Sequence, residues 1–110
     1  MSTYTYKNFR LVCTASYVTA YTCPAGTTAI VIHAQAANID GSLTVALSGQ
    51  WLDSSNADAA TRLADAMSIP IKASIAPIDG QLTLEAGDAI QFKAGDTSDI
   101  EISGSVVEIT

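Results

Sequence analysis

The sequence predicts an all-β protein: a single antiparallel β-sandwich, jelly-roll-like, with about eight short strands. Two observations lead to this prediction. Short segments rich in β-branched and aromatic residues, several of them alternating apolar and polar residues, recur along the chain. Clusters of glycine, proline, asparagine and aspartate separate them at intervals of about eight to twelve residues. We expect residues 1–8 to form an N-terminal arm, extended in conformation, and residues 9–110 to form the sandwich domain.

The first half of the chain contains predicted strands at residues 7–14, 17–23, 29–36 and 43–48. In the first of them Phe9, Leu11 and Cys13 alternate on one face, and we expect a hairpin turn near Ala15–Ser16 to follow. The third, AIVIHAQA, is apolar on both faces, as is typical of a central strand. The turn sequences PAGTT and NIDGS lie before and after it.

The second half contains predicted strands at residues 68–76, 81–85, 89–94 and 100–109. Pro70 has no backbone N–H, so it favours an edge position or a bulge for the first of these strands. In the last strand the apolar alternation changes parity between Ile102 and Val107. This change predicts a β-bulge around Ser103–Gly104–Ser105.

The pattern of residues 57–67 leaves two alternatives open. The apolar residues of this stretch have the spacing of an amphipathic helix, namely Ala60, Leu63, Ala64 and Met67. Ser55 or Asn56 would then cap the helix. The alternative is an extended strand with a turn near Asp65.

Composition excludes several classes of partner. The net charge is −6 and the five cations are scattered, so the chain lacks the basic stripe of a nucleic-acid-binding protein. Anionic membrane surfaces would repel it, and no apolar run is long enough to span a bilayer. The first ten residues lack the apolar core of a secretory signal, so we expect synthesis in the cytoplasm. Only 15% of residues are charged, which suits a surface covered by neighbours in an assembly.

The tripeptide AGD occurs twice, at residues 86–88 and 94–96. We interpret both copies as turns, in which Gly87 and Gly95 supply a positive φ and the following aspartate bonds to the turn backbone.

Two functional alternatives remain for the acids of this region. A weak surface Ca²⁺ site would use Asp96, Asp99 and Glu101, although their spacing is not that of a calcium-binding loop. A catalytic carboxylate pair would need two acids facing a cleft. Its members would come from Glu85, Asp88, Asp96, Asp99 and Glu101.

His33, Cys13 and Cys23 are the histidine and the two cysteines of the chain. They are too few for a zinc site, and their spacing matches no standard pattern. Neither thiol has the local sequence of a nucleophile. We expect both cysteines to be free and buried, and His33 to be packed or at an interface. The sequence therefore predicts no enzyme activity, no cofactor and no resident metal.

Five aromatic residues are candidates for an interface: Tyr4, Tyr6, Tyr17, Tyr21 and Trp51. Aromatic side chains on strands suit burial against a neighbouring subunit. Exposed ring faces would alternatively bind carbohydrate. For Trp51 a third interpretation is an anchor in the core.

The order of motifs resembles that of small virion structural proteins of tailed phages, which are of β-sandwich type. The segment YTCPAGTTAIVIHAQAANIDG is similar to their Tyr-Thr-x-Pro-Ala-Gly turn, hydrophobic strand and Ala-Asn turn. The segment SIPIKASIAPIDGQLTLEAGDAIQFKA and the ending SGSVVEIT are similar to their second half. The likeness covers residues 21–110 and favours the strand at residues 57–67. The alanine-rich stretch 57–66 and Cys23 depart from the pattern.

The resemblance implies a non-enzymatic component of a phage particle. It would assemble as a homo-oligomer on the capsid, as a decoration or cement protein, or at the head–tail neck. Its partners would be its own copies and other virion proteins, such as major capsid or neck and tail proteins, and neither nucleic acid nor membrane. Its location would be the virion, after synthesis in the host bacterial cytoplasm. The alternative is a carbohydrate- or receptor-binding β-sandwich module of a phage fibre or baseplate.

Overall fold

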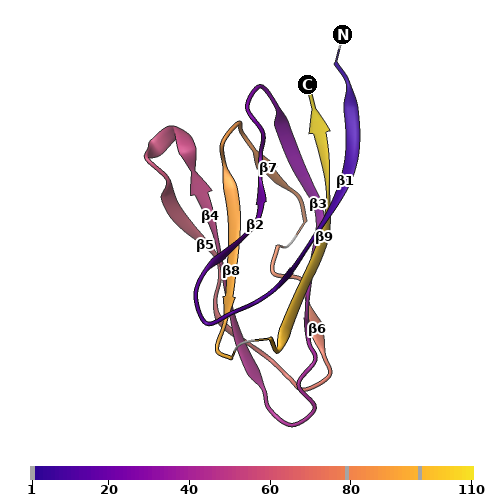
Figure 1. The fold of residues 1–110 in the computed structure, drawn as a ribbon, viewed down its shortest axis with the longest axis vertical. Coiled ribbons are helices and arrows are strands. Elements are labelled where there is room, and N and C mark those ends of the chain that lie inside the picture. Colours follow the sequence, from indigo (N-terminus) through magenta and orange to yellow (C-terminus); the bar gives the residue numbers. More distant parts are fainter. Residues whose placement is uncertain (1, 79, 97) are drawn as a thin grey trace.

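A computed structural model of the protein describes residues 2–78, 80–96 and 98–110. This part of the chain forms nine strands and a single 3₁₀ turn (Figure 1): β1 (Tyr4–Val12), β2 (Val18–Thr22), β3 (Thr28–Asn38), β4 (Val45–Asp53), η1 (Ser54–Asn56), β5 (Ala59–Ile69), β6 (Ser74–Ile75), β7 (Leu82–Leu84), β8 (Ala89–Ala94) and β9 (Ile100–Ile109). The all-β prediction is confirmed. The described residues include no helix with the length and apolar character needed to cross a membrane.

The strands form two antiparallel sheets that face each other (Figure 1). The first sheet has the order β1-β9-β3, with β6 and β7 both paired to the far side of β3. The second sheet has the order β2-β8-β4-β5. With β6 and β7 taken as one interrupted strand, this is the pairing order of a jelly roll, the arrangement predicted from the sequence.

The hairpin predicted near Ala15–Ser16 is wrong. β1 pairs with β9 in the first sheet, whereas β2 pairs with β8 in the second. The segment between them therefore carries the chain from one sheet to the other. Two neighbouring alternating segments look the same in sequence whether they form a hairpin or cross between sheets, so the local pattern could not distinguish these cases.

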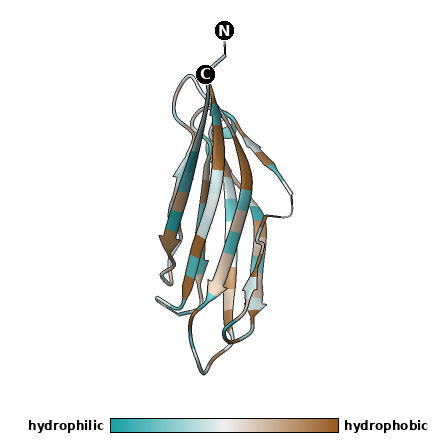
Figure 2. Cartoon of the chain, turned by 90° about the vertical axis from the view of Figure 1, so that its right-hand side faces the viewer, coloured by the Kyte–Doolittle hydropathy of each residue, from teal (hydrophilic) through white to brown (hydrophobic). Residues whose placement is uncertain are grey.

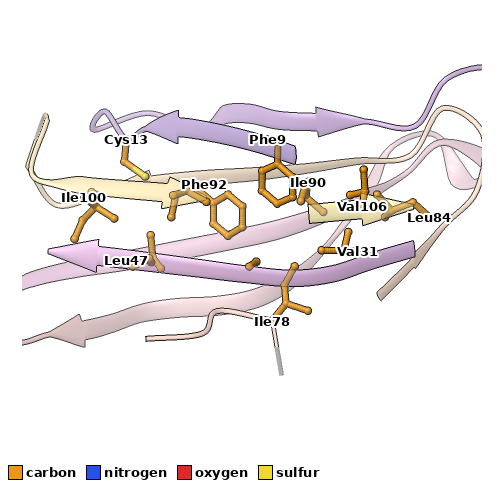
Figure 3. Close-up of a cluster of buried hydrophobic side chains, with 14 of the residues drawn as sticks. Phe9, Cys13, Val31, Leu47, Ile78, Leu84, Ile90, Phe92, Ile100 and Val106 are labelled. Atoms are coloured by element: carbon orange, nitrogen blue, oxygen red, sulfur yellow. The ribbon is translucent and has the colours of Figure 1, made fainter. Parts of the chain in front are cut away.

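Alternate residues of both sheets fill the space between them. Strands β1, β3, β4, β8 and β9 each contribute buried side chains to this space, for example Phe9, Val31, Leu47, Phe92 and Ile102 in that order. Figure 3 shows such side chains, including Phe9, Leu47 and Phe92, projecting into one common apolar layer. A fully buried side chain of this kind stabilises the fold by about 1.5–3 kcal/mol, so this layer supplies the main driving force for folding.

The predicted bulge lies in a different strand. β9 pairs with β1 without interruption through residues 103–105, so the bulge is not in β9. Instead the register between β3 and β9 shifts between Val31 and His33, which makes Ile32 the extra residue. As a result Val31 faces the core while His33 is exposed, although the two share parity in the sequence.

Residues 57–67 contain no α-helix, and most of them belong to strand β5. The pairing of β5 with β4 shifts twice, on either side of Gly49. Of the four residues with helical spacing only Ala64 is buried and Leu63 is half-buried, whereas Ala60 and Met67 are exposed, so the spacing does not mark one buried face. Near Asp65 the chain bulges rather than turns. Asp53, and not Ser55 or Asn56, caps the short 3₁₀ turn that precedes the strand.

The single strand predicted at residues 68–76 is also wrong. β5 ends at Ile69, and the N–H of Ala73 donates to the carbonyl of Pro70 at 3.2 Å, closing a turn. Lys72 adopts a positive φ of 56° in this turn, and β6 begins at Ser74. Pro70 cannot donate to a ladder, which explains why the strand stops beside it.

Gly104 provides a test of the core packing. A Cβ at this position would lie 2.4 Å from Cζ of Phe9 and 2.4 Å from the carbonyl oxygen of His33. We expect Gly104→Ala to lower the free energy of unfolding by about 2 kcal/mol or more, because the ring and the backbone must move apart. Urea unfolding measures the change. Gly95→Ala is the matched control, since its nearest non-neighbour atom is 3.8 Å away. Equal destabilisation by both substitutions would contradict this account.

Candidate functional site

The five candidate aromatic residues do not form one cluster. Tyr4 and Tyr6 lie on β1 and are 63% and 76% exposed. Tyr17 lies in the connection between β1 and β2. Tyr21 on β2 and Trp51 on β4 are partly buried and pack against the core.

Tyr21 connects the two sheets. Its hydroxyl donates to Oε2 of Glu108 at 2.5 Å, and Nζ of Lys7 lies 3.0 Å from Oε1 of the same carboxylate. Its ring lies 6.3 Å from that of Phe9. Burial, followed by the hydrogen bond to Glu108, raises the pKa of Tyr21, whereas the hydrogen bonds from Tyr21 and Lys7 lower the pKa of Glu108. These groups use one another as partners, so Tyr21 has a structural role in this contact.

Trp51 donates its indole N–H to Asp88 at 3.3 Å. Asp88 is the aspartate of the first AGD turn and is fully buried. It also accepts from the backbone N–H of Ser54 at 2.9 Å, the hydroxyl of Ser54 at 3.0 Å and the backbone N–H of Glu85 at 2.9 Å. This carboxylate therefore fastens the loop after β4 to the β7–β8 turn.

Hydrogen bonds determine the charge of Asp88. Burial by itself would raise the pKa of its carboxyl group, but the donors from Ser54, Glu85 and Trp51 outweigh burial and lower that pKa. The ionised form is thus the one that the folded chain stabilises.

One trio of carboxylates converges in the described residues: Asp53, Glu85 and Asp88, with an oxygen of each within 4.8 Å of the others. Carboxylate oxygens are suitable ligands for a hard cation. However, both oxygens of Asp88 already accept two hydrogen bonds each, so a cation would have to displace protein donors. We interpret the trio as part of the turn structure.

The acids proposed for Ca²⁺ do not form such a trio in the described part of the chain. Asp99 lies near Asp40, and burial together with the negative charges of Asp40 and Asp96 raises its pKa. Glu85 and Asp88 precede β8, whereas Asp96 and Asp99 follow it. A strand of this length spans about 20 Å, which is too far for a catalytic pair across it.

The two AGD turns differ from each other. Gly87 has a φ of 89°, as expected for a turn that only glycine adopts readily. Gly95 has no positive φ, so that part of the interpretation is wrong for the second copy. Its N–H donates to the carbonyl of Ala46 at 2.9 Å, which ties the β8–β9 connection to β4.

Both cysteines are free and buried, as predicted. Burial raises the pKa of Cys13 to about 11 and raises that of Cys23 as well. Such thiols are poor nucleophiles at neutral pH. His33 is exposed, not packed in the core, so it lies apart from both thiols and forms no Cys–His pair with them.

Tyr17 lies beside two cations. Its hydroxyl accepts from the guanidinium of Arg62, and Nζ of Lys93 lies 4.8 Å from its ring centroid. Nearby, Gln91 accepts from Gln50 at 2.8 Å and donates to Thr19 at 3.1 Å. The outer face of the second sheet is therefore polar here, and its side chains bond to one another.

The outer face of the first sheet is more apolar near the chain termini. Tyr6, Val107 and Ile30 are cross-strand neighbours on β1, β9 and β3, and Tyr4 and Ile109 form the adjacent row. Figure 2 looks onto this side of the molecule, where hydrophobic bands cross neighbouring strands. Ile30, Val107 and Ile109 were not among the candidates from the sequence, although Val107 and Ile109 alternate with Glu108 in β9, which was a usable signal.

Comparison with known proteins finds similarity in fold. No family model matches the chain, and no curated protein matches its sequence. A chain from the acid-stable capsid of Helicobacter pylori bacteriophage KHP30 superposes with a TM-score of 0.58 at 9% identity, covering 100% of this chain and 94% of that one. A chain of Bacillus endospore appendages, a family of disulfide-linked pili, gives 0.56 at 9% identity, covering 98% and 86%.

A chain of the T13 IBDV viral particle gives a TM-score of 0.57 at 5% identity. It is matched over 98% of this chain but only 31% of its own length, so this protein spans about a third of it. At such identities the likeness establishes a shared fold. The β-sandwich of this chain is thus of a kind found in phage and viral capsids and in pili.

Asp88 provides a test of the buried network. We expect Asp88→Asn to lower the free energy of unfolding by about 2–3 kcal/mol at pH 7, because an amide nitrogen would face N–H donors. Urea unfolding measures the loss. Asp96→Asn, at the exposed aspartate of the second AGD, is the control and should change stability by less than about 0.5 kcal/mol.

The same pair of variants tests the pH dependence. The pKa of Asp88 lies below its ordinary value of 3.8, so its contribution is complete above that pH and is lost as the pH falls through the lowered pKa. The stability difference between wild type and Asp88→Asn should therefore shrink on acidification below about pH 4. A difference that stays constant down to pH 2 would contradict this assignment.

Proposed function

We propose that this protein is a non-enzymatic structural protein of a tailed phage particle. It assembles as a homo-oligomer on the capsid, as decoration or cement, or at the head–tail neck, and it stabilises the particle. The observation that carries the proposal is the jelly-roll sandwich, which a phage capsid chain matches over nearly the whole length of both chains.

The chemistry of the described residues supports a structural role. Glu108, Asp88 and Tyr21 have protein partners within the fold, and both thiols are buried. Every buried side-chain nitrogen or oxygen in the described residues has a hydrogen-bond partner. Among the large hydrophobic side chains that remain exposed, Tyr4, Tyr6 and Val12 lie together on β1 of the first sheet, and others lie on β5 and in the connections at residues 39–44 and 70–73. Burial against a neighbouring subunit is the use that such side chains have in an assembly.

A cement protein stabilises a particle by mass action. A chain that binds the assembled shell, and not its separated subunits, favours the assembled state in proportion to its occupancy. Low surface charge reduces the cost of removing that surface from water. The partners are other copies of the chain and virion proteins such as major capsid, neck or tail proteins, and the location is the virion after synthesis in the host bacterial cytoplasm.

The alternative, a carbohydrate- or receptor-binding module of a fibre or baseplate, has weaker support. It relied on exposed ring faces, and Trp51 and Tyr21 are engaged in the interior through Asp88 and Glu108. Tyr17 contacts two cations. Only Tyr4 and Tyr6 of the candidate set keep largely exposed rings.

Particles that lack this chain test the proposal. We expect them to lose infectivity faster than wild-type particles on heating or on dilution into low salt, and purified protein added back should restore tolerance. The measurement is infectivity over time, with a reconstruction of the particle to locate the chain. Equal survival without the chain would exclude cementing, and a reconstruction without density for it would exclude the virion location. Binding on a glycan array would favour the alternative module.

A further inference from the structure

The backbone of β1 has one bonded side and one free side. Thr3 and Thr110 exchange two hydrogen bonds, of 2.9 and 3.0 Å, and the N–H of Cys13 donates to the carbonyl of Ile100 at 2.9 Å. Bonded and non-bonded pairs alternate in an antiparallel ladder, so the odd-numbered residues of β1 bond to β9. The even-numbered residues direct their N–H and C=O groups to the opposite side, where no strand of the described chain pairs with β1.

The other free edges are interrupted or short. β2 has a register shift between Thr19 and Tyr21, and β5 has two shifts against β4. β6 and β7 have only two and three residues. Bulges and short length are two of the means by which proteins prevent edge-to-edge pairing. β1 has neither: its nine residues keep one register with β9 and include no proline. This edge is therefore the one suited to accept another strand.

We propose that two copies of the chain pair antiparallel along β1, about a twofold axis at Asn8, and so join their first sheets into one. In this register Tyr4 lies opposite Val12 of the second copy, Tyr6 opposite Arg10, and Asn8 opposite Asn8. Every backbone N–H and C=O group that β1 directs to its free edge then has a hydrogen-bond partner on the second copy. A twofold axis at Lys7 would leave Val12 unpaired and place two lysines opposite each other, and one at Phe9 would leave Tyr4 unpaired.

Side chains favour the same register. The even-numbered residues lie on the outer face, and three of them are large exposed hydrophobics: Tyr4, Tyr6 and Val12, which are 63%, 76% and 49% exposed. Opposite Val12, Tyr4 gains an apolar neighbour, and opposite Arg10, Tyr6 gains a cation beside its ring. No like charges face each other. Because the strand complements itself in shape, hydrogen bonding and charge, the occupant that fits this edge is a second copy.

Two surface hollows border the same strand, one lined by Tyr6, Lys7, Asn8 and Ser105, the other by residues that include Arg10 and Val12. Paired side chains from a second copy would lie over them. The inference rests on the proposed function in so far as it names the contact through which the homo-oligomer forms.

A disulfide trap tests the register with the full-length chain alone. In the proposed dimer the two copies of position 8 form a bonded pair with Cα atoms about 5.5 Å apart, within the range for a disulfide. We expect Asn8→Cys to give a covalent dimer on mild oxidation. Arg10→Cys is the matched control, because its two thiols would be offset by four residues, more than about 13 Å. Cys13 and Cys23 are buried, so oxidation of the wild-type chain gives the background level of cross-linked dimer. At least tenfold more dimer from Asn8→Cys than from Arg10→Cys is expected, and equal or absent cross-linking would overturn the proposal.

A charge exchange gives a second readout that does not depend on oxidation. Tyr6→Lys places a cation opposite Arg10 of the second copy and should weaken dimerisation at least tenfold in sedimentation equilibrium. The double variant Tyr6→Lys with Arg10→Glu should recover it, and Thr61→Lys, at an exposed position on β5 of the second sheet, should leave it unchanged. Failure of the recovery would overturn the edge pairing. These measurements use no particle, so a monomeric chain that particles still require would refute the edge pairing and leave the virion role intact.

Discussion

Burial of one face of each sheet against the other is the constraint on which the rest of this structure depends. Side chains alternate between the two faces of a strand, and backbone hydrogen-bonding groups alternate between its two edges, both with a period of two. In β1 the odd-numbered residues supply Phe9 and Cys13 to the core and also bond to β9. The even-numbered residues are thereby forced onto both the solvent face and the free edge. The exposed tyrosines and the unpaired backbone of β1 thus have a single cause.

The same constraint explains where the polar groups lie. A carboxylate that enters the space between the sheets needs donors, and Asp88 and Glu108 find them on other strands and loops. The side-chain amide of Asn38 similarly donates to the carbonyls of Ile69 and Leu43, at 2.9 and 3.0 Å, and fastens the β3–β4 loop to the end of β5. These acids and amides hold connections in place. The polar atoms of these side chains are therefore occupied by partners within the fold.

A sandwich of this kind has two surfaces for assembly, its faces and its edges. The second sheet has a polar outer face whose side chains bond to one another, and its edge strands β2 and β5 carry irregularities. The outer face of the first sheet is apolar near the chain termini, and this sheet has one regular edge, β1. The asymmetry between the sheets gives the molecule one side suited to contact with neighbours.

The sequence by itself determined that the chain is all-β, where most strands and turns lie, and that both thiols are buried, because alternation and turn chemistry are local properties. It also included Tyr4 and Tyr6 among five aromatic candidates for an interface, although it placed both in an N-terminal arm and the structure has them on β1. Only the tertiary structure decided that β1 and β2 belong to different sheets, that the bulge lies at Ile32 in β3, and that Trp51 bonds to Asp88. Each of these depends on a partner strand that is distant in the chain, and a local pattern contains no information about which distant segment will supply it.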